Sequence, residues 1–124
     1  MQNSIPPEDR VFKNFEAVFI AYSIFVKLSL LKEVSVQNFI SEIDTLKGKI
    51  DNTLLIKKPK KDMYIMYTIH KLKEWVMLGK QDVWEEKMIK HFGFKKETYD
   101  RKKEVGDEYK NELHLKIDKE FNRY

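Results

Sequence analysis

The segment from Ser35 to Ile69, SVQNFISEIDTLKGKI followed by DNTLLIKKPKKDMYIMYTI, decides the expected fold. Ser35 is placed to cap a short helix at its start, and Gly48 follows the end of that helix, where a left-handed backbone suits glycine. Ile50 then returns the chain to the core. The helix itself is predicted from apolar residues that recur at helical spacing and form one face: Val36, Phe39, Ile40, Ile43 and Leu46.

The rest of this segment predicts a β-hairpin with a basic tip. Residues 54–56 and 64–69 are two apolar runs, and the second is rich in aromatic and β-branched side chains. The break between them, KKPKKD at 57–62, is polar and contains a proline. Two such runs around a break of this kind are typical of paired strands. A helix, a Gly-x-Ile exit and a basic hairpin together resemble the second half of a winged helix-turn-helix domain.

Length and composition restrict the class of protein. A chain of 124 residues forms one domain, or two very small ones that share a core. The net charge of +4, from 24 basic and 20 acidic residues, is a mild hint of a polyanionic partner. Without cysteine the chain has no disulfide and no thiolate metal site. No apolar run reaches the ~18 residues of a membrane span, and the first residues lack a signal-peptide pattern, so we expect a soluble cytoplasmic protein without a membrane partner.

The first 31 residues predict two helices. The sequence PPED at 6–9 is typical of a helix start, because proline fits the first turn and acids favour the positive end of the helix dipole. Apolar residues then follow at helical spacing from Phe12 to Leu30, and around the middle of this stretch they occur nearly all round the helix. Such a helix must be covered on several sides or break. We expect a break near residues 20–23, with helices at about 8–20 and 21–31.

The second half of the chain predicts a similar order of elements. A helix face runs from Ile69 to Leu78 and ends at Gly79, and Asp82 with Glu85 forms a predicted capping box for the next helix. A very polar helix is expected at about 95–110, and the alternation at 113–117 is typical of a strand. A weak repeat at an offset of 60 residues supports two similar modules.

The sequence KMIKHFGFKKETYDRKK at 87–103 resembles the helix-turn-helix of many repressors and of phage and plasmid regulators. The matching positions are Met88, Ile89, Phe92, Gly93, Phe94, Thr98 and Tyr99. Glycine is expected in the turn because its φ is positive. Two positions depart from the pattern: these families usually have a small residue where Ile89 stands and an apolar one where Lys102 stands. The resemblance implies that the second helix enters the major groove of DNA.

The predicted fold is therefore mainly α with short β-hairpins, in the form of tandem, pseudo-dimeric winged helix-turn-helix modules that share a core. The modules span residues 1–62 and 63–124 and pack as one compact unit. In size and in its predicted layout, the chain is similar to the TraN-like conjugation accessory proteins. By that analogy the chain acts as a regulator or DNA-transfer accessory factor of a mobile element.

The candidate DNA-binding residues come from both modules. Arg101 is the candidate for a bidentate guanine contact, the lysines are candidates for phosphate contacts, and the amides of the first module suit adenine edges. The alternative interpretation is a solvated charged helix face and a loop that confers solubility. The complete set is Gln37, Asn38, Ser41, Thr45, Lys57, Lys58, Lys60, Lys61, Lys90, Lys95, Lys96, Thr98, Arg101, Lys102 and Lys103.

No catalytic or metal-binding motif is present in the sequence. His70, His91 and His114 lack metal-ligand spacing, and each is expected to be a surface or capping residue. There is no phosphate-binding glycine loop and no nucleophile elbow. We therefore expect no metal, no cofactor and no enzymatic activity.

Two functions remain open on this basis. The first is binding of double-stranded DNA, with a homodimer or another protein as a further possible partner. The second is an all-helical protein-interaction module of the immunity or anti-defence type, which would use the aromatic-rich helix at 8–31. A DNA-binding protein should keep residues 12–30 buried and place its two basic segments on one side, whereas an interaction module should expose an apolar patch.

Overall fold

The computed structural model describes residues 7–123, and within this range the protein is helical. The α-helices are α1 (Phe15–Tyr22), α2 (Val36–Ile43), α3 (Asp62–Lys73), α4 (Gln81–Phe92), α5 (Lys96–Lys102) and α6 (Glu112–Phe121). A π-helix, η2 (Ser23–Lys27), extends α1, and two 3₁₀ turns lie at η1 (Pro7–Asp9) and η3 (Asp107–Tyr109). Only two isolated β-bridges, Phe12 with Val76 and Leu31 with Lys57, occur in the described part of the chain.

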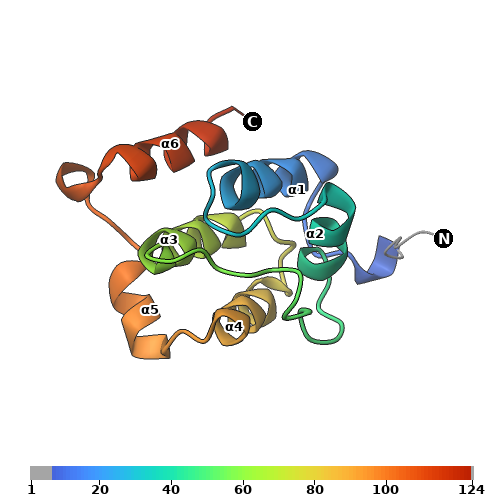
Figure 1. Cartoon of the computed structure of the whole chain (residues 1–124). Coiled ribbons are helices and arrows are strands. Elements are labelled where there is room, and N and C mark those ends of the chain that lie inside the picture. Colours follow the sequence, from blue (N-terminus) through green and yellow to red (C-terminus); the bar gives the residue numbers. More distant parts are fainter. Residues whose placement is uncertain (1–6, 124) are drawn as a thin grey trace.

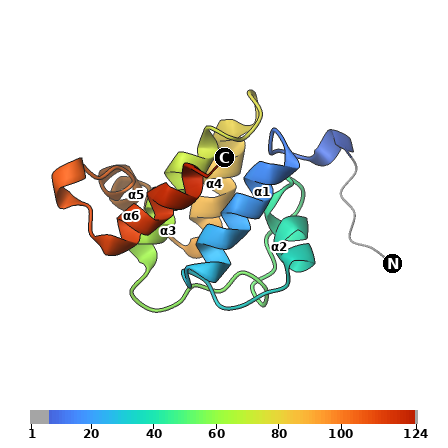
Figure 2. The same ribbon diagram turned by 90° about the horizontal axis from the view of Figure 1, so that it is seen from above.

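Helix α3 lies at the centre of the molecule and packs against α4, α5 and α6. In Figure 1, α6 lies on one side of α3, and α4 and α5 lie on the other. Helices α1 and α2 pack together, and η2 contacts α6. Helices α2 and α5 lie at opposite ends of the molecule in both views (Figures 1 and 2).

The winged-helix prediction is wrong, because the expected hairpin does not form. Residues 54–56 lie in a loop, and residues 64–69 belong to α3. Five consecutive residues of this run, 65–69, are buried, which matches a helix covered on several sides by its neighbours. A short apolar run cannot by itself distinguish a buried strand from a buried helix. The layout behind the resemblance to winged-helix and TraN-like proteins is therefore absent from residues 7–123.

The strand expected at 113–117 is also helical and belongs to α6. The residues of α6 that are buried are His114, Ile117 and Phe121, whose spacing is that of one helix face, whereas Leu115 is exposed. Asn111 caps this helix, since its side-chain oxygen accepts hydrogen bonds from the N–H groups of Leu113 and His114. The His114 ring in turn accepts a hydrogen bond from the Asn111 N–H, which completes a capping box.

Three other predicted boundaries differ from the structure. Helix α1 begins at Phe15, where Asn14 caps it, and not near residue 8. Near the expected break at 20–23 the chain does not turn, and instead its hydrogen bonding changes from α to π at Ser23. Helix α5 ends at Lys102, well short of residue 110, because Tyr99 is the one buried residue that holds it.

The prediction for the helix after Ser35 is confirmed at its start, but the helix ends at Ile43, so Leu46 lies outside it and Gly48 does not end it. Helix α2 covers Val36–Ile43, and the Ser35 side chain accepts a hydrogen bond from the N–H of Asn38. Gly48 has a φ of 68° and Ile50 is buried. The core contains residues from both halves of the chain. The Trp84 indole of the second half donates a hydrogen bond to the Ile43 carbonyl of the first half. The division at residue 62 stays a prediction.

Candidate nucleic-acid interface

Helices α4 and α5 are joined by the tight turn that the sequence predicted at Gly93. Gly93 has a φ of 74°, its N–H donates to the Lys90 carbonyl, and the N–H of Phe94 donates to the Ile89 carbonyl. This pair of hydrogen bonds is the Schellman arrangement, which ends a helix at a left-handed residue. Residues 81–102 therefore form a helix, a tight turn and a second helix, and both helices pack on α3.

A buried carboxylate joins the three helices of this unit. Glu85, on α4, is 7% exposed, and it accepts a hydrogen bond of 2.5 Å from the Tyr99 hydroxyl of α5 and one of 2.9 Å from the Lys73 ammonium of α3. Burial by itself raises the pKa of Glu85, but the hydrogen bonds from Tyr99 and Lys73 outweigh it, so the pKa lies below its ordinary value. Burial and the contact with Glu85 raise the pKa of Tyr99. The carboxylate is thus ionised at neutral pH and sets where α5 lies.

The capping box predicted from Asp82 and Glu85 does not form, and the buried role of Glu85 was not predicted. Helix α4 instead begins after Lys80, and no side chain caps it. A signal was present: Glu85 stands three residues before Met88, four before Ile89 and seven before Phe92, all buried. This spacing places the carboxylate on the apolar face of the helix.

The outer face of α5 carries both signs of charge. Lys96, Arg101 and Lys102 are exposed, but Asp100 pairs with Lys96 at 3.1 Å and with Lys103 at 3.4 Å. The hydrogen bond from Lys96 is the main cause that lowers the pKa of Asp100. Among the described residues, the basic side chains at 87–103 that are predicted DNA contacts and make no ion pair are Lys90, Lys95, Arg101 and Lys102.

The basic segment, defined as residues 57–61, lies beside the turn of the helix-turn-helix. The Lys57 ammonium is 5.0 Å from the centroid of the Phe94 ring, directly after the turn. Two residues before Lys57, the Leu55 carbonyl is 2.7 Å from Nε2 of His91, near the end of α4. Lys57 also pairs with Asp62, whose negative charge offsets that of the ammonium. The structure thus brings the basic segment next to the start of α5, although no wing forms.

The candidate residues of α2, and Thr45 just after it, are not part of this surface, because α2 lies at the other end of the molecule from α5 (Figure 2). Thr45 is 8% exposed, and its hydroxyl accepts a hydrogen bond from the N–H of Lys47. Ser41 donates to the Asn38 carbonyl within its own helix. Gln37 is exposed on the same helix. Helix α2 and helix α5 therefore do not form one binding face.

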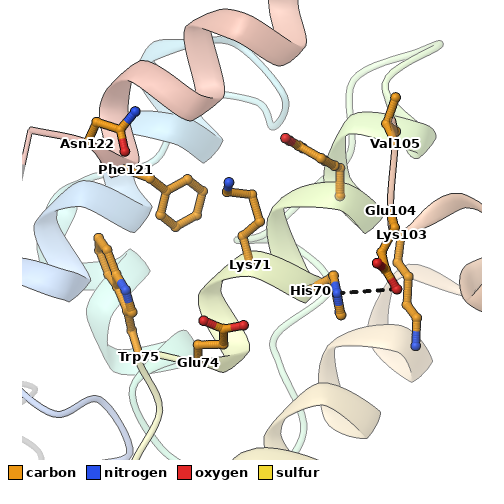
Figure 3. A pocket seen from close by; sticks show the side chains of 10 residues that line it. His70, Lys71, Glu74, Trp75, Lys103, Glu104, Val105, Phe121 and Asn122 are labelled. Carbon is orange, nitrogen blue, oxygen red and sulfur yellow. Dashed lines mark ion pairs between the residues drawn. The ribbon is translucent and has the colours of Figure 1, made fainter. Parts of the chain in front are cut away.

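A pocket of about 390 Å³ lies between α3, the end of α6 and the segment after α5 (Figure 3). Phe121 and Lys71 face into it, and Lys71 pairs with Asp118 at 3.2 Å. His70 lies 3.9 Å from Glu104, a contact that is an ion pair only when the ring is protonated. The cationic groups of this pocket therefore already have carboxylate neighbours.

Two aromatic side chains on α1 are exposed, contrary to the burial expected of a DNA-binding protein at 12–30. Phe15 is 59% exposed and Phe19 is 49% exposed, and their spacing of four residues places them on one face. The Arg10 guanidinium covers one side of the Phe15 ring at 3.8 Å from its centroid. Phe12, Phe25 and the other large side chains of this stretch are mostly buried.

Comparison with known proteins adds no relative: no protein-family model, no curated protein and no solved structure matches this chain. Among residues 7–123, no group of three or more histidine and acidic side chains is arranged to hold a metal ion. None of the helices in this range has the length and apolar character needed to cross a membrane.

Proposed function

We propose that the protein binds double-stranded DNA through the helix-turn-helix of α4 and α5, with the basic segment as an additional phosphate contact. The observation that carries the proposal is the contact between Lys57 and Phe94, because it brings the basic segment next to the turn between α4 and α5. The left-handed turn at Gly93 supports it, since it gives α4 and α5 the connection typical of such motifs.

The roles within this surface follow from exposure and charge. Arg101 is exposed and without an ion pair, so it is free to make a bidentate contact with a guanine. Lys58, Lys60 and Lys95 are suited to phosphate contacts. The cytoplasmic location expected from the sequence is part of this proposal. The role as a regulator or DNA-transfer accessory factor stays a prediction.

Fluorescence anisotropy with a labelled random-sequence duplex tests the proposal. Between about 50 and 200 mM salt, a protein that makes 6–10 phosphate contacts loses roughly 10³–10⁵ in affinity. Lys58→Ala should weaken binding to all sequences and lower the salt slope by about 1, whereas Arg101→Ala should relax the preference for a selected site. Lys116→Ala is the matched control, because Lys116 is exposed on α6, across α3 from this surface. No binding at about 50 mM salt would overturn the proposal.

A protein-interaction module is the second candidate, and the exposed Phe15 and Phe19 favour it. If these rings form a contact surface between copies of the chain, sedimentation velocity should show association that increases with concentration. Phe19→Ser should abolish that association and leave the helical circular dichroism unchanged. A wild-type protein that stays monomeric at every concentration would exclude self-association through α1.

A further inference from the structure

A cleft of about 780 Å³ lies between the segment after α2 and the outer side of α4. Three lysines line it, Lys49 from the segment and Lys87 and Lys90 from α4, and Glu86 is the one acid of the lining. Leu46, Ile50 and Val83 supply apolar surface beside them. The cleft thus combines an excess of positive charge with an apolar wall.

Lys87 is the most constrained of these cations. Its ammonium donates to the Thr45 carbonyl at 2.7 Å and to the Glu42 carbonyl at 3.2 Å, at the end of α2. It makes no ion pair in the described part of the chain. Burial lowers the pKa of Lys87, and the more distant charge of Glu42 offsets this only in part. An ammonium has three N–H donors, so one donor of Lys87 remains for a group in the cleft.

Lys49 and Lys90 also lack a carboxylate partner among residues 7–123. The cleft therefore differs from the pocket at His70, where Lys71 is already paired with Asp118. An anion that enters the cleft would meet three ammonium groups that make no ion pair, with Glu86 as the one acid of the lining. Charge-assisted hydrogen bonds from such groups are among the strong ones in proteins.

We propose that this cleft binds a phosphate-bearing ligand, with Lys87 as the anchoring group and Lys49 and Lys90 at its sides. The volume of about 780 Å³ exceeds the needs of a bare phosphate, so the ligand carries a larger body that packs against the apolar wall. The phosphate belongs either to a free small molecule or to the backbone of DNA. The inference does not rest on the DNA-binding proposal, because a small phosphate ligand needs no contact with α5.

The test is a titration of ¹⁵N-labelled protein followed by amide chemical shifts at constant ionic strength. Inorganic phosphate, adenosine monophosphate and adenosine are the small probes, and a short random-sequence duplex is the fourth. We expect adenosine monophosphate to shift the amides of residues 46–52 and 87–91, and to bind more tightly than phosphate. Adenosine, which lacks the phosphate, should leave these amides unchanged.

Variants at the rim separate binding from folding. Lys90→Gln and Lys49→Gln should each weaken the binding of adenosine monophosphate roughly two- to five-fold, as expected for a partly exposed charge pair. Lys87→Gln should weaken it more, and its circular dichroism spectrum shows whether α2 is intact without the contacts to its carbonyls. Lys116→Gln is the control and should bind like wild type.

The results separate the two sources of the phosphate. Shifts in the cleft with adenosine monophosphate support a small ligand, and shifts there with the duplex alone, reduced in Lys90→Gln, support a DNA backbone. No shift in the cleft with any probe overturns the inference. Equal shifts around Lys116 and in the cleft also overturn it, since they show general attraction of anions. DNA binding that fails while adenosine monophosphate still binds would overturn only the DNA-binding proposal.

Discussion

Removal of one oxygen atom at Tyr99 tests whether the buried carboxylate of Glu85 holds the helix-turn-helix together. Tyr99 is completely buried, so its hydroxyl has no water to bind in place of Glu85. In Tyr99→Phe the ring keeps its packing, but Glu85 keeps only Lys73 as a partner. A hydrogen bond to a charged group contributes about 1.5–3 kcal/mol, so the free energy of unfolding should fall by that amount.

Urea and thermal unfolding followed by circular dichroism measure this loss. For a chain of this length 1 kcal/mol corresponds to roughly 4 °C in Tm, so we expect a decrease of roughly 6–12 °C. Tyr109→Phe is the matched control: Tyr109 is 77% exposed, and the same substitution there should change stability by less than about 0.5 kcal/mol. Equal stability of Tyr99→Phe and wild type at pH 7 would refute the structural role of this carboxylate.

The pH dependence of this difference provides a second check. The pKa of Glu85 in the folded protein lies below the ordinary value of 4.5. For an acid with a lowered pKa, stabilisation is present above the pKa of the unfolded state and is lost as the pH falls through that of the folded state. The gap between wild type and Tyr99→Phe should therefore be constant from about pH 6 to 8 and narrow below about pH 4.5. A gap that grows on acidification would contradict the assignment.

Two further substitutions test other parts of the fold. Burial lowers the pKa of His114 in the folded protein from 6.5. As the pH falls, His114 is therefore protonated in the unfolded state before it is protonated in the folded state, and the wild type should lose stability below about pH 7. Glutamine can replace the histidine in the capping box, so His114→Gln should remove this loss of stability at low pH. The measurement is Tm against pH, and the same pH dependence in the variant and the wild type would contradict the role of His114. Gly93→Ala should lower the free energy of unfolding in urea by about 1–2 kcal/mol, because alanine is strained at a φ of 74°. An added Cβ meets no atom within 4 Å, so no steric clash contributes. An unchanged urea midpoint would exclude a left-handed turn at Gly93.

Short-range signals in the sequence were sufficient for several elements. Ser35 predicted the start of α2, and Gly93 predicted the turn between α4 and α5. Each signal depends on atoms within a few residues of one another, such as a side-chain cap or a positive φ. These interactions form in the same way whatever the rest of the chain does, so the sequence alone was enough to identify them.

Packing decided the elements that the sequence left ambiguous. Residues 64–69 fit a buried strand and a buried helix equally well by pattern, and the surfaces of α4, α5 and α6 around them determine that they form α3. The role of Glu85 depends on Lys73 and Tyr99, which lie 12 and 14 residues away, and the contact of Lys57 with Phe94 spans 37 residues. Side chains so far apart in sequence meet only when the helices pack, because no local interaction determines the distance between them.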